Sequence, residues 1–250
     1  MKKIVFFFFF ILLSGTSTAQ RDVSINTEVW YGLMTSGQLA KNWSLWIDSH
    51  HVPELFLIVR GGLTYHSNNQ QWSATMGYAG LGLTTPFSAG DLIRNERRPW
   101  GQVVFRPPGK GNLSASFRYR HDMRFRQQFS STELLDSYQL NHRLRFNASV
   151  RYNWRDLISP HVNFSTTLFN ESLFTVGPAL ADNPFEHRVF MLFSFQKKFV
   201  TVSPGYHIRV ATPNPETLRI NHGLFLWINI NYSLKEFRRS KIKVFPEDRI

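Results

Sequence analysis

Arginine alternates with apolar residues in the stretch SASFRYRHDMRFRQQ, which runs from Ser114 to Gln128. A helix turns by about 100° per residue and would spread both sets around its surface, whereas a strand sends successive side chains to opposite faces. The stretch is therefore predicted to be a strand with one apolar face and one guanidinium face. The two sets are Arg118, Arg120, Arg124 and Arg126 on one face and Phe117, Tyr119, Met123 and Phe125 on the other.

The segment from Tyr138 to Trp154 has the same two-residue period, because each of its odd positions is polar. Weaker alternation recurs along the chain after residue 20, without a long helical period or an apolar run long enough for a spanning helix, which needs about 20 residues. The predicted strands are 26–36, 43–52, 55–66, 71–84, 98–107, 113–127, 138–153, 160–169, 186–198, 199–211 and 218–234.

Long strands favour an all-β transmembrane barrel over a soluble secreted β-sandwich, since strands of globular proteins usually have about 5 or 6 residues. The predicted fold is a single antiparallel up-and-down β-barrel of about 10–12 strands. Single-chain bacterial barrels have an even number of strands. The eleven segments above therefore indicate one further strand, or one strand divided into two, and the expected number is ten or twelve. The longer connections, 85–97, 128–137 and 170–185, are expected to lie outside the cell.

The N-terminus has the form of a secretory signal peptide: Lys2 and Lys3, an apolar run from Ile4 to Leu13, and small residues before Gln20. We therefore expect a signal peptide at 1–19, an outer-membrane barrel at 20–234, and a basic tail or short last strand at 235–250. The chain has no Cys, which excludes disulfides and thiolate metal sites.

A formal net charge of +12 with 23 Phe and 7 Trp could indicate nucleic-acid binding in a cytosolic protein, but export makes that partner an unsuitable one. The expected partners are outer-membrane lipid, lipopolysaccharide, the barrel-assembly machinery and small anionic solutes. Aromatic residues near predicted strand ends indicate an interfacial belt at the periplasmic side. They are Trp43, Tyr65, Trp72, Tyr152 and Trp154.

Two motifs resemble those of a bacterial outer-membrane family known only as domain of unknown function 2490. NERRPWGQ (Asn95 to Gln102) is similar to its motif E-x-R-x-W-x-Q, and RYRHDMRF (Arg118 to Phe125) to its motif R-x-R-x-E-x-R-F. MGYAG, SPGYHIR and INHGLFL, which begin at residues 76, 203 and 220, are similar too. The resemblance implies an outer-membrane barrel without an established activity. Asp122 stands where the motif has Glu, and its shorter side chain has less reach.

Two polar clusters contain residue types that are found in catalytic or metal sites. YHSNNQ (Tyr65 to Gln70) is similar to the His-x-Ser pattern of outer-membrane phospholipases, but His66 and Ser67 are adjacent, so a strand would point them apart, and a polar turn is predicted instead. In DSHH (Asp48 to His51), Asp48 and His50 lie on the same face of the predicted strand, but a zinc site requires three or four protein ligands. We expect no enzyme activity, cofactor or metal; a barrel enzyme acting on lipid or lipopolysaccharide is the alternative.

The arginine rows are predicted to line a narrow lumen, either as a structural network that plugs it or as a passage that favours anions. Glu28, Asp48 and Glu96 could reach in from other strands and neutralise part of the charge. A symmetric hairpin through 128–137 would place Asp122 opposite Arg143. The predicted lumen network comprises Glu96, Arg98, Arg118, Arg120, Asp122, Arg124, Arg126, Arg143, Arg145 and Arg151.

Overall fold

The computed structural model describes residues 21–85, 87–178, 180 and 184–233, so the predicted signal peptide and the basic tail lie outside the described residues. Within the described part of the chain, no helix is long and apolar enough to cross a membrane. The strands are β1 (Asp22–Thr27), β2 (Trp30–Ala40), β3 (Trp43–Val52), β4 (Phe56–His66), β5 (Trp72–Leu83), β6 (Arg94–Phe105), β7 (Leu113–Phe129), β8 (Leu134–Ser159), β9 (Val162–Val176), β10 (Phe185–Lys197), β11 (Val200–Asn214) and β12 (Thr217–Ser233).

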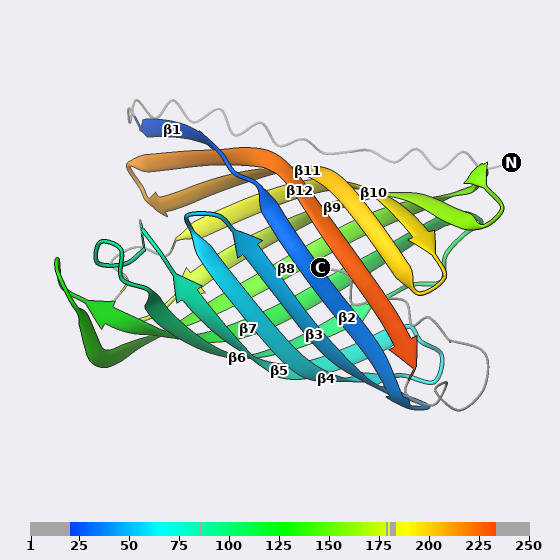
Figure 1. Ribbon diagram of the computed structural model, residues 1–250, viewed down its shortest axis with the longest axis horizontal. Helices are drawn as coiled ribbons and strands as arrows, with labels where there is room; N and C mark the ends of the chain where they lie inside the picture. The colour runs from blue at the N-terminus through cyan, green and yellow to red at the C-terminus, as the bar shows by residue number, and fades with distance from the viewer. Residues whose placement is uncertain (1–20, 86, 179, 181–183, 234–250) are drawn as a thin grey trace, which may run out of the picture.

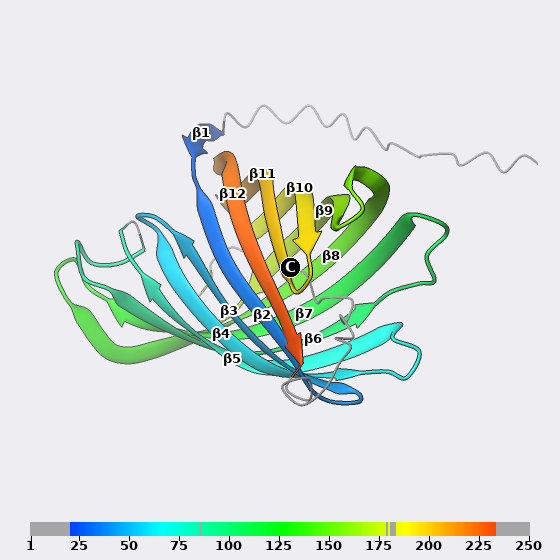
Figure 2. The same cartoon turned by 45° about the vertical axis from the view of Figure 1, so that its right-hand side comes forward.

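Eleven of these strands, β2 to β12, form a closed barrel (Figure 1). Each pairs in antiparallel fashion with the next along the chain, and the circle is closed by β12 against β2, which run in the same direction (Figure 2). β1 pairs with the first half of β12, also in parallel. The register does not change between β1 and β2, because Thr27 pairs with His222 and Trp30 with Phe225. β1 and β2 are thus one interrupted strand.

The predicted barrel of about 10–12 strands is therefore confirmed: it has eleven, as counted from the sequence, and only the expectation of an even number is wrong. An odd number makes the first and last strands parallel, so the closing pair departs from the predicted all-antiparallel barrel. The single closed sheet also rules out a two-sheet sandwich. Several strands exceed their predicted bounds, and the largest extensions are in two of them: β8 runs from Leu134 to Ser159, and β9 continues to Val176. In both, pairing extends into segments without clean alternation, such as 170–172, where both faces are polar.

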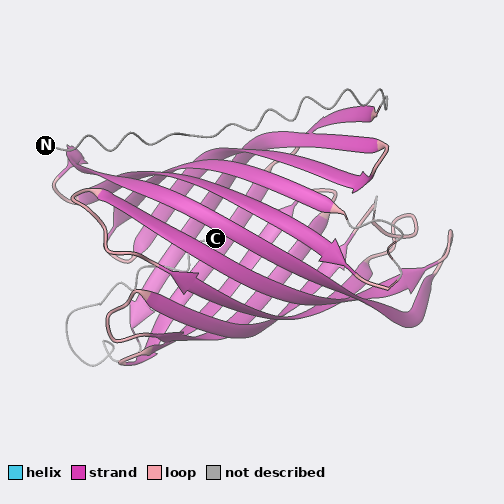
Figure 3. Cartoon of the chain, turned by 180° about the vertical axis from the view of Figure 1, so that it is seen from behind, coloured by secondary structure: helices cyan, strands magenta, loops and turns pink. Residues whose placement is uncertain are grey.

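The two ends of the barrel differ. One end, here called the loop end, carries the two longest connections, 84–93 and 177–184, together with 53–55, 130–133 and 215–216. The connections 130–133 and 177–184 are shorter than predicted, because the flanking strands continue into them. The other end, here called the girdle end, carries the connections 41–42, 67–71, 106–112, 160–161 and 198–199. All strands cross between the two ends at a tilt (Figure 3).

The outer surface of the barrel is apolar along its strands: Leu57, Val59 and Leu63 of β4, for example, are each 44–50% exposed. At the girdle end this surface carries a belt of exposed aromatic rings, which gives that end its name. The belt contains the five residues that the sequence analysis placed there, paired as Trp43 with Tyr65, Tyr152 with Trp154, and Trp72 with Phe105.

The inner face of the barrel is filled by side chains. One aromatic cluster is built from Trp30, Phe169, Phe190, Phe225 and Trp227, and a second contains Trp46 and Trp100. Trp100 lies over Gly77 of the neighbouring strand, where a Cβ atom would be 2.6 Å from its ring. The glycine therefore makes room for the indole.

Gly223 permits the closing parallel pair, because a Cβ atom at this position would lie 1.8 Å from the carbonyl oxygen of Glu28, at the interruption between β1 and β2. We expect Gly223→Ala to lower the free energy of unfolding by about 2 kcal/mol or more, since the clash is with backbone and cannot be relieved by a rotamer change. Urea titration in lipid vesicles measures the effect.

Gly80→Ala is the matched control. A Cβ atom on Gly80 would have nothing within 4 Å, so a change within about 0.5 kcal/mol is expected. Equal effects of the two substitutions would show that the contact between Gly223 and Glu28 does not limit closure.

Candidate functional site

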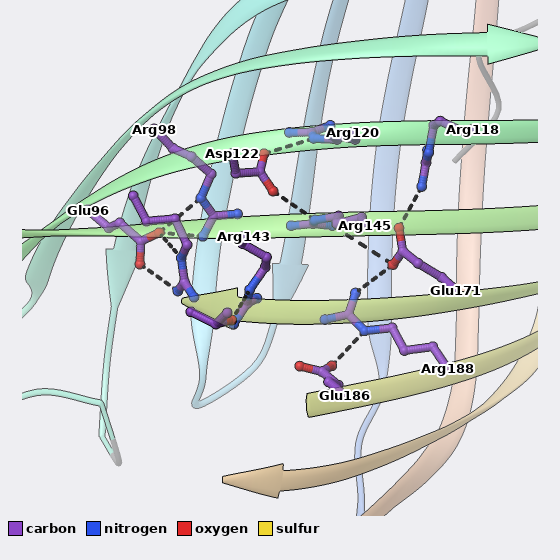
Figure 4. Close-up of polar contacts among 12 residues, drawn as sticks. Glu96, Arg98, Arg118, Arg120, Asp122, Arg143, Arg145, Glu171, Glu186 and Arg188 are labelled. Carbon is purple, nitrogen blue, oxygen red and sulfur yellow. Dashed lines mark hydrogen bonds and ion pairs between the residues drawn. The ribbon is translucent and has the colours of Figure 1, made fainter. Parts of the chain in front are cut away.

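The inner face of β6 and β7 carries a carboxylate surrounded by arginines (Figure 4). Glu96, only 1% exposed, accepts hydrogen bonds from Arg124 Nε at 2.7 Å, Arg126 Nε at 3.0 Å and Arg98 Nη2 at 2.5 Å. Period-two alternation places all four side chains on this face, as predicted for the arginine rows. A buried carboxylate with three guanidinium partners is held ionised in one orientation.

Asp122 forms a second centre between β7 and β8. It is fully buried and accepts hydrogen bonds from Arg120 Nε at 2.8 Å and Arg145 Nε at 2.7 Å. The predicted register is confirmed, since Asp122 lies opposite Arg143 and Arg120 opposite Arg145. The ion pair is nevertheless made with Arg145, on the diagonal, because Arg143 turns toward β9 and donates from Nε to Thr175 Oγ1 at 3.1 Å.

Two further carboxylates, which the sequence analysis did not single out, extend the network to β9 and β10. Glu171 accepts from Arg118 Nη2 at 2.7 Å and lies 3.9 Å from Arg145 Nη1. Glu186 accepts from Arg188 Nε at 2.6 Å. The sequence predicts residues 170–185 as a connection, which leaves Glu171 outside a strand, and it places Glu186 at the very start of one. The available signal for both residues is that each is polar at an inward position of its strand.

The network continues to the closing pair of strands. Arg188 lies 3.5 Å from Glu171, and Arg209 lies 3.4 Å from Glu186 and 3.6 Å from Glu28. Glu28 also contacts His207 Nε2 and accepts from Asn221 Nδ2, each at 3.0 Å. Carboxylates and arginines thus alternate around the inner wall from β7 to the start of β2. Figure 4 shows the part from Asp122 to Glu186.

The structure places the ten predicted lumen residues on the inner face, but two of them stand apart from the carboxylates. Arg143 and Arg151, both on β8, form no ion pair with a described residue. Arg151 lies toward the girdle end, where its Nε donates to Thr167 Oγ1 at 3.1 Å. Asp48 also reaches in, as the sequence analysis allowed, and accepts from Arg60 Nε at 2.7 Å.

Next to the network lies a cavity of about 280 Å³ inside the barrel. It extends to the loop end, because Phe87 and Pro184 from the two longest connections line it. Ten arginines and two glutamates contribute to its wall. The rest of the wall is largely aromatic and aliphatic and includes Trp30, Phe190 and Trp227. The cavity is therefore basic on one part of its surface and apolar on another.

The girdle half of the lumen has different contents. Its inner face carries small hydroxyl side chains that pair across neighbouring strands, such as Thr64 with Thr75 at 2.9 Å and Ser194 with Ser203 at 2.8 Å. These residues are buried, with Thr64 at 0% and Ser194 at 2% exposure. The inner wall is therefore packed against itself at these hydroxyl pairs.

The two polar clusters YHSNNQ and DSHH take part in local contacts. His66 ends β4 and points inward, where its Nε2 lies 2.8 Å from Ser44 Oγ, while Ser67 belongs to the turn 67–71, as predicted. Asp48 and His50 share the inner face, with 3.9 Å between Oδ1 and Nε2. Among the described residues, no group of three or more His, Asp or Glu side chains is placed to hold a metal ion.

Comparison with known proteins places this chain in a family. The model of the family described as Protein of unknown function (DUF2490) matches residues 27–217, which is most of the barrel. The chain belongs to this family. Glu96, Arg98 and Trp100 on β6 and Arg120 and Asp122 on β7, which belong to the two stretches that resemble family motifs, all point into the barrel.

Other comparisons add little. No curated protein matches the sequence. A solved structure described as the NanC porin in a rhombohedral crystal form is 17% identical, with 70% of this chain and 78% of that chain covered and a TM-score of 0.41. The barrel architecture of this DUF2490 member therefore rests on its own strand pairing.

Loss of the Asp122 carboxylate is expected to destabilise the barrel. Asp122→Asn keeps the shape of the side chain but leaves Arg120 and Arg145 buried without their main counter-charge, which costs about 3–5 kcal/mol for a broken buried pair. Urea unfolding in vesicles, followed by tryptophan emission, measures the loss.

Asp136→Asn serves as the control, because Asp136 lies on the same strand pair but is exposed. It should change the free energy of unfolding by no more than about 0.5 kcal/mol. An Asp122 variant as stable as this control would contradict a structural role for the ion pairs.

Proposed function

We propose that this protein is an outer-membrane β-barrel with a closed lumen, which binds a solute in its cavity at the loop end and does not conduct ions. The burial of inward-facing side chains of β4, β5, β10, β11 and β12 in the girdle half carries the proposal. Thr201 is 1% exposed and Asn231 4% exposed, although both side chains point into the barrel. Side chains fill small barrels, whereas open channels appear at about 16 to 18 strands.

The outer-membrane location is supported by three observations. The outer surface of the strands is apolar, as hydrocarbon contact requires. The girdle end carries exposed Trp and Tyr rings, whose amphipathic character suits the headgroup region. The sequence also begins with a segment of secretory form. Lipid and lipopolysaccharide would then surround the barrel, and the loop end would face outward.

A narrow passage for anions is the second candidate, and the surplus of arginine favours it. The cavity wall has ten arginines, while six carboxylates of the described residues point into the barrel: Glu28, Asp48, Glu96, Asp122, Glu171 and Glu186. A positive wall lowers the entry barrier for anions and raises it for cations. The closed girdle half argues against flux, so binding from one end is the better-supported function.

Fractionation tests the location. We expect the full-length chain, expressed in a Gram-negative host, to be recovered in the outer-membrane fraction and to need detergent for extraction. Its band should migrate differently with and without heating, because a closed barrel resists denaturation by detergent until heated. Recovery from the soluble periplasm without detergent would overturn the barrel-in-membrane proposal.

Conductance tests the closed lumen. The purified protein in planar bilayers under a salt gradient should give no current steps, because no water-filled path crosses the girdle half. An anion-selective current would instead establish the narrow passage, and a cation-selective current would contradict both candidates. Arg143→Ser/Arg145→Ser should remain silent too, since the aromatic clusters and the hydroxyl pairs stay in place.

A further inference from the structure

We propose that the cavity at the loop end binds a small amphipathic anion, with one carboxylate, sulfonate or phosphate group on an aromatic or short aliphatic body. The inference rests on the proposed function, since a closed lumen makes the cavity a pocket with one entrance. Its volume of about 280 Å³ is near the lower end for small-molecule sites, which span about 300–1,000 Å³. The ligand is therefore a compact molecule.

The apolar part of the wall defines the body of the ligand. Trp30, Phe190 and Trp227 come from β10 and from the two strands that close the barrel, and their rings pack against one another at centroid distances of 5.6–5.9 Å. Phe56 joins them edge to face with Trp30. Flat aromatic walls favour an aromatic or slender aliphatic group, and they would gain little from a fully hydrated ion such as sulfate.

The unused hydrogen-bonding groups of the wall define the head of the ligand. The buried N–H donors without a hydrogen-bond partner in the described residues include Trp30 Nε1, Trp227 Nε1, Arg118 Nε and Arg120 Nη2. These four residues are at most 7% exposed, and all four line the cavity. Indole and guanidinium nitrogens can only donate. A ligand that satisfies such a wall must accept several hydrogen bonds, as oxyanions do.

The charge of the cavity wall also indicates an anionic head for the ligand. Arg143 lines the cavity without an ion-pair partner among the described residues, and its one hydrogen bond goes to Thr175. The nearby carboxylates Glu171 and Glu186 are already engaged by Arg118 and Arg188. A negative group beside Arg143 would therefore meet an uncommitted guanidinium. We assign Arg143 as the binding residue that distinguishes an anion from a cation.

The test uses the full barrel in an uncharged detergent and naphthalene-2-sulfonate as the probe. Quenching of tryptophan emission reports binding, because Trp30, Trp46 and Trp227 line the cavity; empty micelles with free tryptophan provide the blank. We expect saturable binding at one site. Naphthalene-2-methylammonium, with the same body and the opposite charge, should bind at least about tenfold more weakly, and methanesulfonate, with the same head and no body, should not saturate.

The chain offers a matched pair of variants. Arg143 and Arg151 lie on the same strand, both lack an ion pair in the described part of the chain, and each donates to a threonine of β9 at 3.1 Å. Only Arg143 lines the cavity. Arg143→Gln should weaken binding of the sulfonate at least about tenfold, as loss of a charge-assisted hydrogen bond does, whereas Arg151→Gln should leave the affinity within about twofold. Heat-modifiable migration verifies folding of both variants.

Equal affinity for the sulfonate and the ammonium probe, or equal losses in the two variants, would overturn the proposal, because nonspecific partition or general loss of charge would then explain the quenching. Conductance separates the two proposals. A silent barrel that does not bind the sulfonate refutes the ligand assignment and leaves the closed lumen standing. A conducting barrel refutes the closed lumen, and the Arg143→Gln and Arg151→Gln comparison then decides the ligand assignment alone.

Discussion

Closure of an eleven-stranded sheet is the constraint on which the rest of this structure depends. The unpaired edges of a sheet cannot be left in an apolar environment, because their N–H and C=O groups would lack hydrogen bonds. With an odd number of strands, β2 and β12 run in the same direction, and the only closure open to them is parallel. The backbone contact of Gly223 with Glu28 is a direct consequence, since β1 continues the same pairing beyond the interruption.

In a closed barrel, alternate side chains of each strand point into an enclosed interior. The arginines of β6 to β8 that point there require negatively charged partners. The carboxylates come from strands far apart in the chain: Glu28 contacts His207, 179 residues later. Buried ion pairs contribute little net stability compared with apolar packing, but breaking one is costly. We therefore expect the network to specify how the strands are aligned around the barrel, and strand pairing and aromatic packing to supply most of the stability.

Sequence alternation predicted the strands, the register of β7 with β8 and the inner arginine rows, because on these strands the two faces differ in polarity. Alternation gave no such information on strands whose two faces have the same polarity. On β12, Phe225 and Trp227 point inward and Leu224 and Leu226 outward, so both faces are apolar and the lumen cluster could not be separated from the outer surface. Partners such as Glu171 for Arg118 depend on the closed barrel, which a local pattern does not describe. The even-number rule failed because a parallel closing pair was not considered.

The two halves of the interior satisfy their buried polar groups in different ways. In the girdle half, neutral hydroxyl pairs such as Thr64 with Thr75 satisfy one another, with a few arginines such as Arg151 among them. In the loop half, guanidinium groups outnumber the carboxylates that face them, and several of their donors find no acceptor in the described chain. A purely structural filling could have used hydroxyls throughout, since buried charge carries a desolvation cost that hydroxyls avoid. That cost is concentrated beside the cavity at the loop end, and this placement favours a binding surface over a plug.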